Sequence, residues 1–178
     1  MENDFLIRAA LLNLDGQLAE QAPSWSGYNR DGGNGAATMH VPPSEIADIL
    51  DLPGMNTLLG LAEVCERGLP VESLHRLAQA MSSNEQAFLD CFFSRSTLRR
   101  RHQGGKLTPD ESDRVVRLAS TWLMARDTFG DEAKAHRFLH QEHALLGGRR
   151  PFDLARASGP GAKAVEQVLG RLRYGTAA

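Results

Sequence analysis

Apolar side chains recur at helical spacing along most of this 178-residue chain, and short motifs of Gly, Pro and capping residues interrupt the pattern. Leu74, Leu77, Ala78 and Met81, for example, fall at positions i, i+3, i+4 and i+7, which places them on one face of a helix. Strand signals are nearly absent, and residues 39–41 form the sole candidate. The sequence therefore predicts an all-α fold.

Capping residues, prolines and glycines set the expected helix boundaries. The predicted helices cover residues 1–18, 45–50, 56–66, 70–81, 84–92, 95–103, 109–129, 131–145 and 160–173, and Pro151 opens a further short helical turn. The predicted N-caps are Ser44, Asn56, Ser82 or Ser83, Asp131 and Ser158. Thr108 followed by Pro109 and Glu111 is the pattern of a capping box, the strongest helix start in the chain.

These helices divide the chain into three regions. Residues 1–43 are an N-terminal segment that we expect to be partly flexible. Within it, Gly, Asn, Asp and Ser dominate residues 21–37, and ordering such a stretch loses more entropy than its few apolar side chains return. Residues 44–106 form a first helical region and residues 107–178 a second.

The composition favours a cytoplasmic protein. No window approaches the roughly 18 uninterrupted apolar residues of a membrane helix. Glu2 and Asp4 stand where a secretory signal has basic residues. The two cysteines, Cys65 and Cys91, have neither CxxC nor metal-site spacing.

The net charge of −2 conceals a strong polarity along the chain. Residues 1–50 hold seven acids and two bases, whereas residues 94–109 hold five bases and no acid. Residues 149–178 hold six bases and two acids. The middle and the C-terminal part can therefore face anionic partners, and the N-terminal part cannot.

Two short predicted helices, 84–92 and 95–103, are joined by a tight break, and the second is rich in arginine. This is the arrangement of a helix-turn-helix, here within about residues 71–106, whose second helix lies in the major groove of DNA. The residues predicted to contact DNA are Arg95, Ser96, Thr97, Arg99, Arg100, Arg101 and Lys106. The alternative is an ordinary surface helix with a solvated basic face.

The most specific motifs lie near the C-terminus. They are Phe138-Leu139, Leu146-Gly147-Gly148, Pro151 with Leu154, Gly161-Ala162 with Val165, and Arg171 with Tyr174-Gly175. In this order and spacing they resemble the toxin-binding domain of the Xre/MbcA/ParS antitoxins. Phe138 stands where that family often has Trp, and Glu142-His143 stand where it often has Pro-Asn.

The arginine-bearing middle of the chain resembles the Xre-type helix-turn-helix of the same family, so the resemblance covers about residues 55–178. It implies an Xre-like helix-turn-helix bundle followed by a small helical toxin-binding domain at residues 107–178. It also implies a RES-domain toxin that consumes NAD⁺ as the partner, with the C-terminal end covering the toxin's active site. Operator DNA is the second expected partner, and binding to it would repress the operon.

Residues are assigned to toxin contact on this resemblance. They are Leu146, Gly147, Gly148, Pro151, Leu154, Arg171, Arg173, Tyr174 and Gly175. The two adjacent glycines allow the positive φ that a sharp reversal requires. The last helix then packs back and leaves Arg171, Arg173 and Tyr174 projecting with the tail.

A homodimer is expected because two DNA half-sites need two reading heads. The helices at 55–66 and 109–125 are both candidate dimer faces, and the sequence does not choose between them.

The sequence offers no constellation for catalysis and implies no cofactor. His136, His140 and His143, with Glu142, fall at helical spacing and could share a metal ion, but a surface histidine cluster is the favoured interpretation. The main alternative function is a stand-alone helix-turn-helix regulator whose C-terminal helices sense a small ligand.

Overall fold

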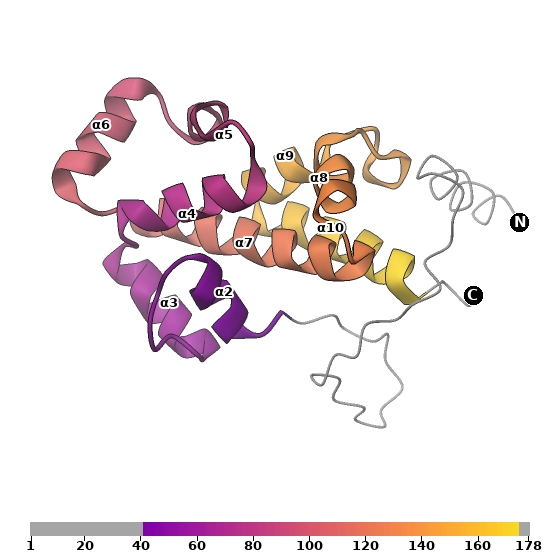
Figure 1. The fold of residues 1–178 in the computed structure, drawn as a ribbon, viewed down its shortest axis with the longest axis horizontal. Helices are drawn as coiled ribbons and strands as arrows, with labels where there is room; N and C mark the ends of the chain where they lie inside the picture. The colour runs from indigo at the N-terminus through magenta and orange to yellow at the C-terminus, as the bar shows by residue number, and fades with distance from the viewer. Residues whose placement is uncertain (1–40, 175–178) are drawn as a thin grey trace, which may run out of the picture.

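The computed structural model describes residues 41–174, and within them every regular element is helical (Figure 1). The α-helices are α2 Pro43–Ile49, α3 Leu58–Arg67, α4 Val71–Met81, α5 Glu85–Phe92, α6 Arg95–Gly104, α7 Pro109–Phe129, α8 Glu132–His140, α9 Pro151–Ala157 and α10 Gly159–Tyr174, and a 3₁₀ turn, η1, spans Ala144–Leu146. The predicted all-α fold is confirmed. The expectations for residues 1–40, including the 1–18 helix, the flexible segment and most of the strand candidate, lie outside the described residues.

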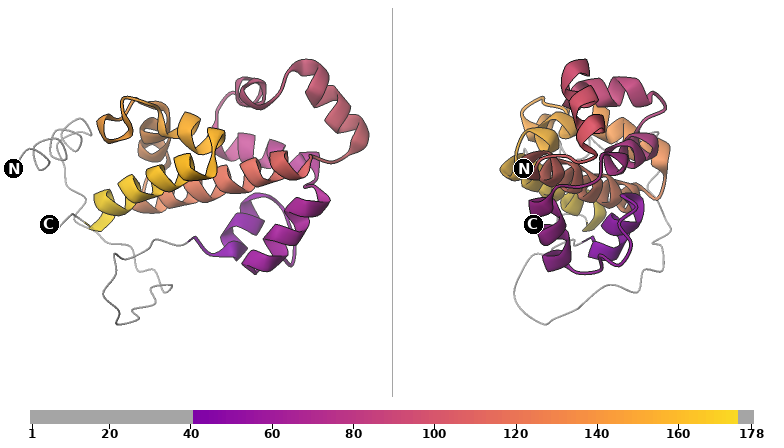
Figure 2. Two further views of the ribbon diagram at one scale, coloured as in Figure 1. Left: turned by 180° about the vertical axis from the view of Figure 1, so that it is seen from behind. Right: turned by 90° about the vertical axis from the view of Figure 1, so that its left-hand side faces the viewer.

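Helix α7 is the centre of the fold. It packs against α2, α3 and α4 from one half of the chain and against α8, α9 and α10 from the other. Figure 2 shows the consequence: α6 lies at one end of the long axis, and the C-terminal helices lie toward the other end.

The core runs without a break through both halves. Val115, Leu118, Ala119 and Trp122 of α7 are all buried and belong to one cluster that extends from Val41 to Leu169. The predicted core stripe of the 70–81 helix is likewise buried in α4. Both halves of the chain pack on the buried face of α7 and form one packed unit. The predicted domain boundary at residue 107 therefore stays a prediction.

The predicted capping box begins α7. The Thr108 N–H donates to Glu111 Oε2 at 2.7 Å, and the Glu111 N–H donates to Thr108 Oγ1 at 3.4 Å. Two N–H groups that the first helical turn leaves without partners are thereby satisfied. The predicted Asp131 cap of α8 is also confirmed, since its side chain accepts from the Lys134 N–H at 2.8 Å.

Three other predicted N-caps are wrong by one or two residues. Helix α2 begins after Pro42 and contains Ser44. Thr57, not Asn56, caps α3, and Asn84, not Ser82 or Ser83, caps α5. Where several short polar residues are adjacent, any of them could cap, and packing of the helix decides which one does.

The predicted helix over 131–145 is also too long. Helix α8 ends at His140 because Gln141 is extended, and the chain then forms η1. The His143 side chain caps η1 by accepting from the Leu145 N–H at 3.3 Å.

The junction between α9 and α10 requires a residue without a Cβ. A Cβ on Gly161 would overlap the carbonyl oxygen of Leu154 and lie 2.9 Å from its carbonyl carbon. The Ser158 hydroxyl accepts from the Gly161 N–H at 3.0 Å in the same turn. Close approach of the two helices therefore explains this glycine of the Gly-Ala motif.

Replacing Gly161 with Ala should destabilise the chain by about 1–3 kcal/mol, because backbone atoms of α9 must shift to admit the methyl group. Urea denaturation measures the change. Gly170→Ala, on the same helix with open space at the Cβ position, is the matched control and should be neutral or stabilising. Equal stability of the two variants would contradict the close-approach argument.

Candidate functional site

Helix α6, the predicted recognition helix, has no fully buried residue. It starts at the Ser94 cap, whose hydroxyl accepts from the Thr97 N–H at 3.3 Å, and ends at Gly105 in the left-handed conformation. Phe92 and Phe93, at the break between α5 and α6, are buried and anchor the turn. The pair α5–α6 thus has the predicted helix–turn–helix order, with the second helix at the surface.

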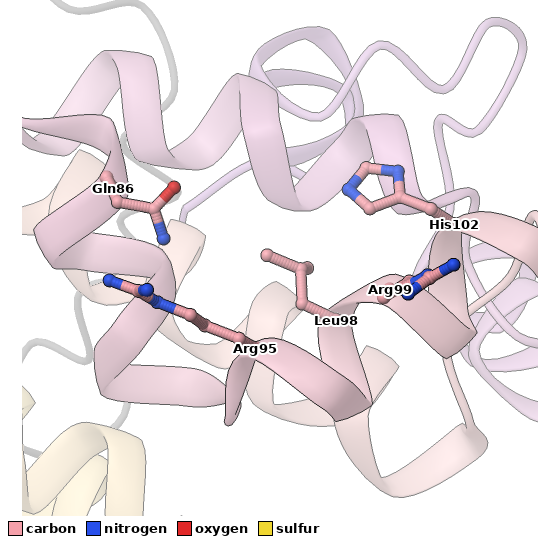
Figure 3. Close-up of a pocket in the computed structure, with 5 residues that line it drawn as sticks. All are labelled: Gln86, Arg95, Leu98, Arg99 and His102. Atoms are coloured by element: carbon pink, nitrogen blue, oxygen red, sulfur yellow. The ribbon is translucent and has the colours of Figure 1, made fainter.

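One face of α6 turns toward α5. Arg95, Leu98, Arg99 and His102 fall at i, i+3, i+4 and i+7, and together with Gln86 of α5 they line a hollow of about 430 Å³ (Figure 3). Leu98 is half-buried and supplies apolar surface between the polar side chains. The hollow is therefore flanked by two guanidinium groups.

The seven predicted DNA-contact residues comprise four exposed bases, two hydroxyl residues and Arg101. Arg95, Arg99, Arg100 and Lys106 are exposed, and none of them forms an ion pair with another residue of 41–174. Ser96 is exposed and Thr97 half-buried, each with its hydroxyl 3.0 Å from that of Ser94.

Arg101 differs from its neighbours because it has a partner inside the chain. Its Nε lies 2.8 Å from Oε2 of Glu111, and the two side chains are 20% and 12% exposed. Burial opposes ionisation of Glu111, but hydrogen bonds from Thr108 and Arg101 outweigh it and lower the pKa of Glu111. Arg101 thus fastens α6 to the start of α7.

The diglycine at the C-terminal half makes the predicted reversal. Gly147 and Gly148 have φ of 65° and 73°, a region that residues with a Cβ rarely adopt. The Gly148 N–H donates to the His143 carbonyl at 3.1 Å and closes the turn. Leu146 and Pro151 beside it are buried, and Leu154 is half-buried, so these three predicted toxin-contact residues also pack within the chain.

The end of α10 is only partly free. Arg171 is exposed and Tyr174 is 47% exposed, as predicted for projecting side chains. Arg173 does not project: it forms an ion pair with Asp127 of α7. It follows Val165 and Leu169 at intervals of four, so it continues the row of α10 that faces α7. Gly175 lies outside the described residues.

The C-terminal histidines do not share one centre. The rings of His136 and His140 lie 4.3 Å apart, whereas the His143 ring packs edge-on against Phe138. Burial lowers the pKa of His140 and of His143, and for His140 the cations of His136 and Arg150 add to the effect. Among residues 41–174, no group of three or more His, Cys, Asp or Glu side chains is placed to hold a metal ion.

Two family models match this chain on either side of the middle of α7. Residues 60–120 match the antitoxin Xre-like helix-turn-helix domain, and residues 124–175 match the antitoxin Xre/MbcA/ParS C-terminal toxin-binding domain. Together the two matches show that this chain is similar to the Xre/MbcA/ParS antitoxins in both of their domains. The resemblance drawn from its sequence motifs is confirmed.

A curated relative supports this similarity. Antitoxin Xre of Yersinia enterocolitica serotype O:8 / biotype 1B (strain NCTC 13174 / 8081) is 39% identical over 83 residues. The aligned part is 46% of this chain and spans about half of the relative, 55% of its length. Among residues 41–174, no helix is long and apolar enough to cross a bilayer.

Sequence reasoning missed a cluster that joins three helices of the helix-turn-helix region. His75 of α4 lies between Glu85 of α5 and His102 of α6. The hydrogen bond with His75 lowers the pKa of Glu85. The one available signal was His102 itself, which continues the i, i+4, i+7 row of α6 that faces α5.

A second missed feature is the contact between the helix-turn-helix and the toxin-binding domain. Arg156 of α9 donates to the Cys91 carbonyl near the end of α5 at 2.6 Å. Phe88 of α5 meets Phe152 of α9 edge-on, with ring centroids 5.7 Å apart. The two matched domains are therefore in direct contact.

Proposed function

We propose that this chain is the antitoxin of a type II toxin–antitoxin module. Its C-terminal helices bind and block a toxin, and α5–α6 bind operator DNA and repress the operon. The observation that carries the proposal is the match of both domains of one antitoxin family along a single chain. The chain acts by binding, with no catalytic role.

The toxin that we propose as partner is a RES-domain protein that degrades NAD⁺. Arg149, Arg150 and Arg171 are exposed and form no ion pair with a described residue. Unpaired cations suit the entrance of a pocket that handles phosphate groups. The exposed ring of Tyr174 adds an apolar contact beside Arg171.

We expect that Arg171→Glu combined with Tyr174→Ala abolishes protection when the chain is co-expressed with the toxin encoded by the neighbouring gene. Cell growth and a pull-down of the complex measure the loss. Lys163→Glu, the same charge reversal at the exposed opposite end of α10, is the control and should protect fully.

Point variants are required here, because deleting residues 146–178 would also remove buried Phe152, Val165 and Leu169 and unfold the core. Full protection by the double variant, with unchanged thermal stability, would refute toxin contact at this end. DNA binding without any toxin partner would instead favour a stand-alone regulator.

The DNA surface that we propose is the exposed side of α6. Arg99→Ala and Arg100→Ala should each weaken binding to a duplex from the chain's own promoter region and lower the slope of log affinity against log salt by about one. Arg101→Ala should reduce folding stability by about 1–3 kcal/mol, because it leaves Glu111 without its cation. Electrophoretic shifts at several salt concentrations and urea denaturation measure these effects.

Arg126→Ala, on an exposed arginine outside α6, is the control for charge alone. If the α6 variants keep the wild-type salt slope, the DNA surface lies elsewhere.

We further propose that a homodimer forms through α3. The apolar face of α7 is buried within the chain, so it is not free for a dimer contact. Leu58 and Leu59 at the start of α3, in contrast, are 58% and 70% exposed. Burying these two adjacent leucines against a second copy of the chain would remove apolar surface from water, which is favourable.

Leu58→Asp with Leu59→Asp should convert the dimer into a monomer, as measured by light scattering after gel filtration. Glu142→Lys, at an exposed carboxylate outside α3, should leave the dimer intact. A dimer that survives the double leucine variant would place the interface on another surface.

A further inference from the structure

Helix α6 is held to the molecule by few contacts. None of its residues is fully buried, and Leu98 is its half-buried apolar contact. Two side-chain contacts fasten its last turns: Arg101 with Glu111 of α7, and His102 with His75 of α4. The orientation of α6 therefore depends on polar contacts, whose geometry is directional.

His75 is the central member of the second contact. Its Nδ1 lies 2.5 Å from Oε1 of Glu85, and its Nε2 lies 3.2 Å from Nε2 of His102. The two imidazole rings have centroids 5.0 Å apart. One imidazole thus links α4, α5 and α6, the three helices around the predicted DNA-binding turn.

The chemistry of the three side chains determines which atom donates and which accepts in each of the two hydrogen bonds. The Glu85 carboxylate can only accept, so the proton on neutral His75 resides on Nδ1. Nε2 of His75 is then an acceptor, and the Nε2–H of His102 donates to it. Each link determines the tautomer of the next, as in other oriented histidine pairs.

We propose that His75 and Glu85 are positioning residues for DNA binding: acting through His102, they hold α6 at the orientation in which Arg95, Arg99 and Arg100 meet DNA. This inference rests on the proposed DNA binding by α6. His75 and Glu85 lie on α4 and α5, so they act on α6 without needing to touch the DNA.

The charged neighbours of the two rings do not replace this contact. Glu85 faces Nδ1 of His75, Arg99 shares the hollow with His102, and Arg101 is paired with Glu111 of α7. On α4, Arg76 is paired with Asp51. Losing either imidazole should therefore loosen α6.

Amide hydrogen exchange on the full chain tests the contact without DNA. His75→Ala and His102→Ala should speed exchange in α6 by about tenfold, with α10 unchanged, because local opening becomes easier. His102→Gln keeps a side-chain donor and should restore slow exchange. His136→Ala removes an exposed imidazole on α8 and is the control. Unchanged exchange in α6 in both alanine variants would overturn the proposal.

Binding to the promoter duplex tests the consequence. His75→Ala should bind about tenfold more weakly than the wild-type chain with an unchanged salt slope, because no phosphate contact is lost. His102→Gln, which keeps a side-chain donor, should bind like the wild-type chain.

Other outcomes separate this inference from the proposed function. If His102→Gln lowers the salt slope by about one, His102 itself contacts phosphate and the positioning role is wrong. If the wild-type chain binds and His75→Ala binds equally well, the inference fails and DNA binding stands. If the wild-type chain binds no duplex, the proposed DNA binding fails first, and the inference fails with it.

Discussion

The carboxylate of Glu111 is the contact on which the arrangement of this molecule depends. One oxygen accepts the Thr108 N–H and so fixes the first turn of α7, and the same carboxylate pairs with Arg101 of α6. Helices α7 and α6 are thus joined by one side chain. Because Glu111 is mostly shielded from water, its ionised form is stabilised by these partners together, and losing either one weakens the other. A local capping motif therefore has a tertiary role.

Helix α7 also explains why the two matched domains form one packed unit. The helix-turn-helix match ends at residue 120 and the toxin-binding match begins at residue 124, both within α7. Beyond that shared core, Arg117 of α7 donates to the Ala155 carbonyl of α9 at 2.9 Å, and Arg156 of α9 donates to the Cys91 carbonyl near the end of α5. A rearrangement of α9 would therefore change contacts of the helix that precedes α6.

Most of the fold could be predicted from local signals in the sequence. Thr108 and Glu111, or the adjacent glycines 147 and 148, act within a few residues, so their structural effect is legible in the sequence. The errors arose where distant packing decides. Which of several adjacent polar residues caps α5 depends on where the helix docks, and Arg173 is held by Asp127, 46 positions earlier. The His75–His102 contact joins residues 27 apart, and the row of α6 that contains His102 does not indicate which residue is its partner.

A count of basic residues therefore overstates the binding surfaces of this chain. Of the six bases in residues 149–178, Arg156, Lys163 and Arg173 have carboxylate partners within the fold. In α6, Arg101 is likewise paired with a carboxylate, that of Glu111, whereas Arg95, Arg99 and Arg100 have no such partner within residues 41–174. A cation whose charge is already compensated releases fewer counterions on binding an anionic partner. The exposed cations without an ion-pair partner in the described chain are the ones that remain available to an anionic partner. Apart from Arg67 at the end of α3, they lie on or directly after α6, around the diglycine turn and at the end of α10.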